Sequence, residues 1–119
     1  YMVTSAETAR VVREIDHPAI KMQFDTGALT LTNEEPYAAL DSCASLIGHV
    51  HASEPNLVPL GDGNTDHDAM SSALRQRLSR HIVCIEMLGV ENESRVVSIE
   101  RALQVAVNYY RNSTPEEIV

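Results

Sequence analysis

Helical and extended patterns of apolar residues alternate along the whole chain. Residues 4–15 open with a capping-box pattern, Thr4 to Glu7, and continue with apolar positions at helical spacing, so they predict a helix that ends before Pro18. Comparable patterns predict three more helices, over residues 32–44, 66–78 and 93–112. Apolar runs predict three strands, at residues 19–25, 45–51 and 81–87. The stretch 52–66, rich in Pro, Gly, Asn and Asp, predicts a long loop, and the polar tail 113–119 is expected to fray.

The order of these elements is α-β-α-β-α-β-α, which indicates the α/β class. Strands that alternate with helices pair in parallel through right-handed crossovers. No GxGxxG or GxxxxGK[ST] motif follows any of the strands, so dinucleotide-binding and P-loop functions lose their main support. The length of 119 residues is that of one domain with a modest core, over residues 1–119.

Charge and composition narrow the possible partners. The formal net charge of −8 argues against nucleic acid or an anionic membrane surface as the main partner. No apolar run approaches the roughly 20 residues that a membrane-spanning helix needs, and the first ten residues lack the regions of a signal peptide. Cys43 and Cys84 do not form a CxxC motif, so we expect reduced thiols in a cytoplasmic protein.

Each predicted strand ends in a side chain that can bind a metal ion. These residues are Asp25, His51 and Glu86, separated by 26 and 35 residues, which is about one βα unit in each case. Neighbouring parallel strands would bring them together at the carboxyl edge of the sheet, where α/β proteins build their active sites. A buried carboxylate is costly unless it is paired or coordinated, so two of them beside one histidine are easiest to explain by a divalent cation.

Each of the three residues also has a purely structural explanation. Asp25 can cap a helix, His51 can be a hydrogen-bonded core histidine, and Glu86 can pair with an arginine. Their recurrence at the same place in three strands favours a joint site. Oxygen and imidazole ligands without a thiolate favour Mn²⁺, Mg²⁺ or Co²⁺, and Zn²⁺ is also compatible.

Three stretches of the sequence resemble a known family. "HPAIKMQFDT", "GHVHASEPNLVPLGDGNTDHDAMSSAL" and "HIVCIEML" are similar to the C-terminal half of the xylose isomerase-like TIM barrels, the sugar phosphate isomerases and epimerases of the D-tagatose 3-epimerase type. The resemblance implies a partial, half TIM barrel and assigns metal ligands to Asp25, His51 and Glu86. It also implies isomerisation or epimerisation of a sugar or sugar phosphate through an enediolate, with Glu86 as both ligand and general acid or base.

The sequence departs from that family at several positions. The family's first metal-binding glutamate would lie on a strand before Tyr1. A histidine expected three residues after the metal aspartate is replaced by Ala28, and an arginine expected in the loop after His51 is replaced by Leu57. Both positions contact the substrate in those relatives. Two alternatives therefore stay open: an inactive barrel remnant that self-associates or binds a ligand, and an inosose dehydratase-like lyase with the same three ligands.

Further candidates for substrate binding lie beside His51. His49 shares its strand face, Glu54 and Asn56 follow in the loop as possible substrate contacts or as solvated residues, and Gly61 and Gly63 allow a tight turn near the site or simply before the next helix. His67 and His81 are expected at the surface, and Tyr109 and Tyr110 to pack.

A half barrel is also expected to need a partner. Its edge strands would be unpaired, and the apolar inner faces of residues 19–24 and 81–86 would be exposed. We therefore expect a homo-oligomer or association with the missing N-terminal barrel half.

Overall fold

The structure is a computed structural model that describes residues 2–78 and 80–111. Over these residues the chain forms five α-helices, two 3₁₀ turns and three strands. Their order and bounds are α1 (Ser5–Ile15), β1 (Met22–Asp25), α2 (Thr26–Leu31), α3 (Pro36–Cys43), η1 (Ala44–Leu46), β2 (Ile47–Ala52), η2 (Pro55–Leu57), α4 (His67–Arg77), β3 (Val83–Ile85) and α5 (Arg95–Tyr110).

The three strands form one parallel sheet in the order β1-β2-β3. Asp25 at the end of β1 is paired with His51 of β2, and Ala52 of β2 is paired with Ile85 of β3. The pairing continues one step beyond β3, because the Glu86 N–H donates to the carbonyl of Ala52 over 3.0 Å. The carboxyl ends of all three strands therefore lie at one edge, as the alternating sequence pattern predicts.

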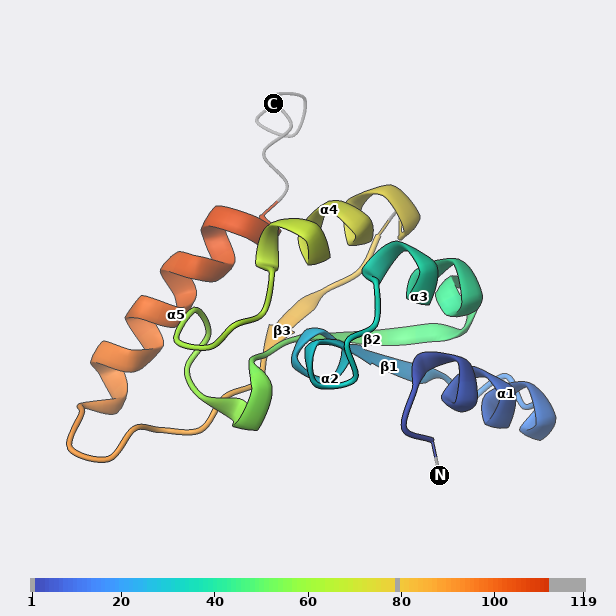
Figure 1. The fold of residues 1–119 in the computed structure, drawn as a ribbon, viewed down its shortest axis with the longest axis horizontal. Coiled ribbons are helices and arrows are strands. Elements are labelled where there is room, and N and C mark those ends of the chain that lie inside the picture. The colour runs from blue at the N-terminus through green and yellow to red at the C-terminus, as the bar shows by residue number, and fades with distance from the viewer. Residues whose placement is uncertain (1, 79, 112–119) are drawn as a thin grey trace.

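Four helices, α1, α3, α4 and α5, make a continuous row against the sheet, with α1 at the β1 end and α5 beside β3 (Figure 1). Neighbours in the row pack together: α1 against α3, α3 against α4, and α4 against α5. This is the arrangement of consecutive βα units in a barrel wall. The structure thus confirms the α/β class and the partial TIM barrel.

The core lies between the sheet and these helices. Alternate residues of the strands point into this core, among them Phe24 of β1 and Val50 and Ala52 of β2. The helices supply the other side, chiefly Leu40 of α3, with Met70, Ala73 and Leu74 of α4. A smaller cluster of Ala9, Met22 and Cys43 holds α1 in place.

Local sequence signals account for most helix ends. Thr4 caps α1, and both bonds of its capping box with Glu7 are present. Pro36 begins α3, where its missing N–H costs nothing, and Asp66 caps α4 through the N–H of Ala69. The four predicted helices are confirmed, each with shorter bounds than predicted. The predicted tail at residues 113–119 lies outside the described residues.

One helix was not predicted. Residues Thr26–Leu31 form α2 directly after β1, because the carboxylate of Asp25 accepts the N–H of Ala28 and caps the turn. Three of its members, Thr26, Gly27 and Leu29, are buried. The helix has only six residues, and its cap, Asp25, is also the last residue of β1, so no separate start signal precedes it.

The expectation of exposed apolar inner faces holds for Ile20 and Ile82, which are 42% and 79% exposed, but not for the strands themselves. The apolar members of β1 and β3 face the helices, where Met22, Phe24, Val83 and Ile85 pack. Alternation leaves a different set on the opposite face: Gln23, Asp25, His49, His51, Cys84 and Glu86. The face that would line a barrel interior is therefore mostly polar.

Apolar surface is exposed instead beside the free edge of β3. Within the described part of the chain, β1 and β3 each have one edge without a neighbouring strand. A groove of about 350 Å³ runs along the β3 edge, lined by Val83, Ile85, Met87, Ile99, Ala102 and Leu103. Leu103 of α5 is 50% exposed there. None of the described helices is long and apolar enough to cross a membrane.

We predict that this groove makes the chain self-associate and that Leu103→Glu weakens the association. Burying one leucine is worth about 2 kcal/mol, so the dissociation constant should rise roughly tenfold or more. Light scattering after size-exclusion chromatography over a concentration series measures the mass. Leu31→Glu, which changes an exposed leucine of α2, is the matched control. A wild-type chain that stays monomeric throughout the series would contradict the prediction.

Candidate metal site at the carboxyl edge of the sheet

The three strand-end residues converge as the sequence predicts. One ligand atom from each of Asp25, His51 and Glu86 lies within 4.8 Å of the other two. His51 Nδ1 is 2.9 Å from Glu86 Oε2 and 3.8 Å from Asp25 Oδ2. The parallel register produces this convergence, since it sets Asp25 beside His51 and places Glu86 one residue beyond the last pair of β2 and β3.

Asp25 is held in place through one of its two oxygens. Oδ1 accepts the N–H of Ala28 over 2.8 Å and the hydroxyl of Ser53 over 2.6 Å. The Ser53 hydroxyl in turn accepts the N–H of Gly27 over 3.0 Å. Oδ2 stays directed toward His51. The geometry is therefore compatible with Asp25 as a helix cap and with Asp25 as a metal ligand. The cap uses Oδ1, and Oδ2 is left to bind an ion.

His51 is surrounded by polar groups from all three strands. Its Nδ1 atom lies 2.9 Å from Gln23 Nε2 of β1 as well as 2.9 Å from Glu86 Oε2. The ring of His49 meets the ring of His51 edge-on, with centroids 4.6 Å apart. His49 is exposed on the same face, whereas His51 is partly buried. Its burial and polar contacts fit a hydrogen-bonded core histidine as well as a metal ligand.

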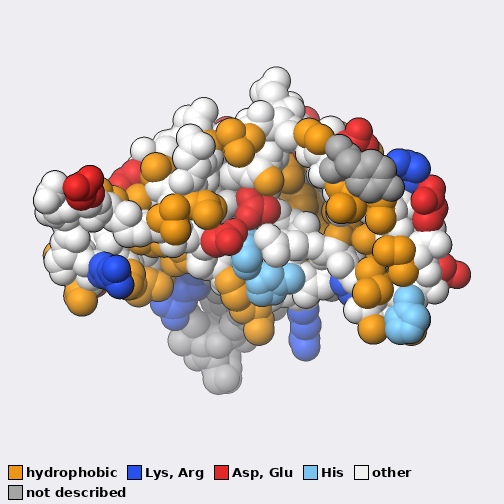
Figure 2. Space-filling model, turned by 90° about the horizontal axis from the view of Figure 1, so that it is seen from below, with side chains coloured by type: hydrophobic (Ala, Val, Ile, Leu, Met, Phe, Trp, Pro, Cys, Tyr) orange, Lys and Arg blue, Asp and Glu red, His pale blue; other side chains and the backbone are white. Residues whose placement is uncertain are grey.

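The site is open on the side away from the helices. The side chains of Asp25 and His51 are 17% and 18% exposed, and that of Glu86 is 42% exposed. In Figure 2, histidine and acidic side chains meet near the middle of this face, with hydrophobic side chains on either side. Glu86 is thus the carboxylate with the most room to move toward a substrate.

Behind the site, a buried glutamate organises the loop that follows β2. The side chain of Glu54 is fully buried. It accepts the N–H groups of Gly61 over 2.9 Å and Thr65 over 3.0 Å, and its Oε1 is 2.5 Å from His67 Nε2. The expectation of a solvated Glu54 is wrong, because the loop wraps around the carboxylate instead of leaving it in water.

The two glycines of the loop make that wrapping possible. Gly61 adopts a φ of +94°, which L side chains rarely reach. At Gly63, a Cβ atom would collide with the carboxylate of Glu54. The predicted tight turn is present, but it closes around Glu54 and not around the three metal-ligand candidates.

Hydrogen bonds hold the pKa of the Glu54 carboxyl below its ordinary value of 4.5. Burial alone raises this pKa, since it disfavours the charged form. The N–H of Thr65, the imidazole of His67 and the N–H of Gly61 outweigh burial, because each stabilises the carboxylate. Glu54 is therefore an ionised carboxylate inside the protein, and its oxygens accept hydrogen bonds from the loop.

The network ties the loop to α5. His67 Nδ1 lies 2.6 Å from the hydroxyl of Tyr110, and burial raises the pKa of that hydroxyl. Arg101 of α5 donates two hydrogen bonds to the carboxylate of Asp62, at 3.2 and 2.7 Å. His67 is buried at 6% exposure, so its expected surface position is wrong, while the expected packing of Tyr110 is confirmed.

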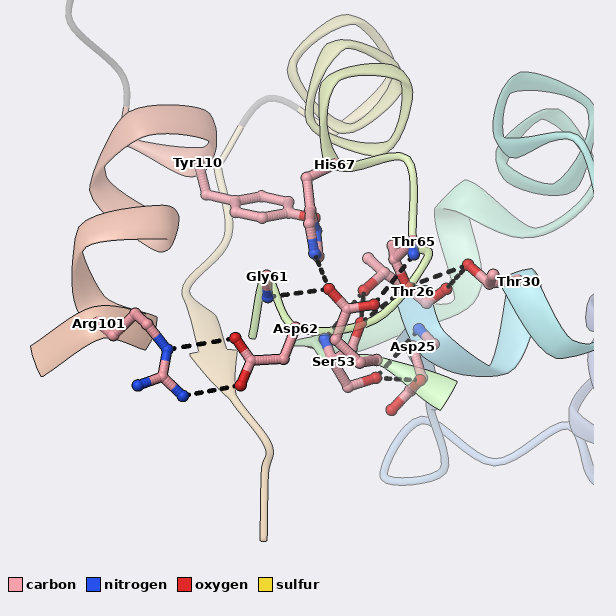
Figure 3. A network of polar contacts seen from close by, with 12 residues as sticks. Asp25, Thr26, Thr30, Ser53, Gly61, Asp62, Thr65, His67, Arg101 and Tyr110 are labelled. Atoms are coloured by element: carbon pink, nitrogen blue, oxygen red, sulfur yellow. Dashed lines mark hydrogen bonds and ion pairs between the residues drawn. The ribbon is translucent and has the colours of Figure 1, made fainter. Parts of the chain in front are cut away.

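The same network reaches Asp25. The carbonyl of Ser53 accepts the hydroxyls of Thr26 over 2.9 Å and Thr65 over 3.2 Å, and the Ser53 hydroxyl donates to Asp25. Figure 3 shows these contacts leading from α5 through the loop to the end of β1. The position of a candidate metal ligand therefore depends on a loop that α5 fastens.

Asn56, the other candidate of this loop, is exposed and has a left-handed φ of 61°.

Sequence reasoning missed Gln23 and Ser53, which contact His51 and Asp25 directly. Gln23 was detectable, because it lies two residues before Asp25 and so on the same strand face. Ser53 contacts Asp25 only because the chain turns after β2, which no local signal shows.

Comparison with known proteins identifies the family. The family model described as xylose isomerase-like TIM barrel matches residues 1–111. This chain belongs to the xylose isomerase-like TIM barrel family. The resemblance seen in the sequence is thereby confirmed.

Solved structures of several sugar epimerases share this fold. A D-psicose 3-epimerase from Clostridium cellulolyticum matches with a TM-score of 0.73 and 20% identity over 92% of this chain and 43% of that one. A 3-keto-D-glucoside 4-epimerase from E. coli matches with a TM-score of 0.71 and 21% identity over 86% and 40%. A D-allulose 3-epimerase from Methylomonas sp. matches with a TM-score of 0.68 and 24% identity over 87% and 36%. The chain spans less than half the length of these proteins.

We predict that Glu54 makes stability depend on pH in the acid range. Its pKa is lower in the folded than in the unfolded chain, so its contribution is complete above pH 4.5 and is lost as the pH falls through the folded pKa. Glu54→Gln leaves one buried donor without an acceptor, which should cost about 1–3 kcal/mol of unfolding free energy at neutral pH.

Urea unfolding at several pH values checks this prediction. The difference between wild type and Glu54→Gln should shrink as the pH falls below 4.5, because the protonated wild-type carboxyl loses the same interactions. Glu100→Gln, at an exposed position of α5, is the matched control and should change little. A difference that stays constant down to acid pH would contradict the assigned ionisation.

Proposed function

We propose that this chain supplies part of the active site of a divalent-metal-dependent isomerase or epimerase that acts on a sugar or sugar phosphate. The observation that carries the proposal is the convergence of Asp25, His51 and Glu86 within 4.8 Å, from three neighbouring parallel strands. Membership of the xylose isomerase-like family supports it, as does the position at the carboxyl edge of the sheet.

The donor set suits a hard or borderline divalent cation. Two carboxylates and one imidazole carry a charge that balances a divalent ion, and none of the three is a thiolate. Ligand atoms about 2.1 Å from a shared ion lie at most about 4.2 Å apart, so a small movement of the half-exposed Glu86 side chain suffices to close the site. Mn²⁺, Mg²⁺ and Co²⁺ fit best, and Zn²⁺ remains compatible.

The three residues would have different roles in the reaction. A bound divalent cation supplies Lewis-acid polarisation of the substrate's carbonyl and hydroxyl oxygens. Asp25 stays fixed, because Ser53 and the Ala28 N–H hold its Oδ1. His51 fills the centre of the edge. Glu86, the most exposed of the three, moves a proton to or from a substrate carbon as general acid or base.

The surroundings point to a substrate other than a ketohexose. Ala28 is exposed at the start of α2, and Leu57 lies in the loop after β2, so neither offers the polar side chain found at these positions in the epimerases that the sequence resembles. We propose exposed His49 and Asn56 as the substrate contacts of this chain. Glu54, Gly61 and Gly63 serve the loop that supports them. An inosose dehydratase-like lyase would use the same three ligands, and a barrel remnant would keep the fold without binding a metal ion.

Calorimetric titration with Mn²⁺ tests the proposal. Wild type should bind one ion, and His51→Ala should abolish the binding because it removes the central ligand. His17→Ala, at an exposed histidine near the other end of β1, is the matched control and should bind as wild type does. A folded wild-type chain that does not bind Mn²⁺ would overturn the metal-dependent function and favour the barrel remnant.

A further inference from the structure

Gln23 is a fourth side chain at the centre of the candidate metal site. It lies on the same face of β1 as Asp25, and it is paired in the sheet with His49 of β2. Its side-chain amide reaches across to His51, with Nε2 2.9 Å from Nδ1. Gln23, Glu86 and Asp25 therefore all approach the same nitrogen atom, at 2.9, 2.9 and 3.8 Å.

A single hydrogen atom does not satisfy these contacts. If Nδ1 carries a hydrogen, it donates to Glu86 but faces the N–H group of Gln23. If Nδ1 has a lone pair instead, it accepts from Gln23 but faces the lone pairs of the Glu86 carboxylate. One of the two close contacts is unfavourable in either state.

The conflict disappears once the Gln23 amide is turned, because a hydrogen on Nδ1, or a cation in its place, then faces only oxygen atoms. The two ends of an amide have nearly the same shape, so a half-turn of the Gln23 amide puts Oε1 where Nε2 lies. Three oxygen atoms, Asp25 Oδ2, Glu86 Oε2 and Gln23 Oε1, then surround His51 Nδ1 at 3.8, 2.9 and 2.9 Å. Side-chain amide oxygens are ordinary ligands of hard divalent cations.

We propose that Gln23 is a fourth ligand of the metal ion, through its Oε1 atom. This inference rests on the proposed metal-dependent function and adds a ligand to that site. Because the amide is neutral, it raises the number of ligands without adding to the charge of the two carboxylates. Gln23 is exposed in a four-residue strand, so its replacement should leave the core unchanged.

Two replacements separate a ligand from a hydrogen-bond donor. Gln23→Met keeps the length of the side chain but removes the hard oxygen, whereas Gln23→Glu keeps an oxygen and removes the N–H donor. Mn²⁺ affinity is measured by calorimetry on both variants and on wild type. The visible absorption of bound Co²⁺ reports the number of ligands independently of affinity. Gln104→Met, on the exposed side of α5, is the matched control.

If Gln23 is a ligand, Gln23→Met should lower Mn²⁺ affinity roughly 10- to 100-fold and change the Co²⁺ spectrum. Gln23→Glu should bind Mn²⁺ at least as tightly as wild type. Unchanged affinity in Gln23→Met would overturn the inference and leave the three-residue site in place. Loss of affinity in both variants with an unchanged Co²⁺ spectrum would also overturn it, since Gln23 would then act as a donor that orients His51. No Mn²⁺ binding by wild type would overturn the proposed function itself.

Discussion

Parallel pairing of three short strands is the constraint on which the rest of this structure depends. It places Asp25 beside His51 and brings Glu86 to the same edge, although these residues are far apart in sequence. The same pairing fixes the direction of every strand side chain. Apolar residues such as Phe24 and Val50 then anchor the sheet to the helices, and the polar residues between them line the open face. A shift of one residue in any strand would exchange the two faces.

The loop after β2 is fastened to this edge of the sheet by hydrogen bonds. Burying an ionised carboxylate is costly unless its oxygens are satisfied, and the backbone of the loop satisfies Glu54. In return, Glu54 fixes a loop in which a single 3₁₀ turn, η2, is the regular structure among the described residues. Hydrogen bonds of Thr65 and Ser53 connect the loop to Asp25, and a contact of His67 with Tyr110 connects it to α5. The candidate metal edge and the helix row are thus parts of one hydrogen-bonded unit.

Sequence reasoning reached the strand-end site because that site follows from two regular features, the strand period and the alternation of strands with helices. Asp25, His51 and Glu86 needed no knowledge of the loops. The burial of Glu54 and His67 could not be predicted in this way, since it depends on how a fifteen-residue loop folds over a charge. The short helix α2 was not predicted, because Asp25 is both the last residue of a strand and the cap of a helix. The apolar runs were identified, but only half of each run faces the core.

Crystals of the chain grown with Mn²⁺ would test the central claim most directly, through anomalous diffraction measured above and below the manganese absorption edge. The account predicts an anomalous peak about 2.0–2.3 Å from side-chain atoms of Asp25, His51 and Glu86. A map without a peak there, in which His51 keeps a direct hydrogen bond to Glu86 at saturating Mn²⁺, would contradict it.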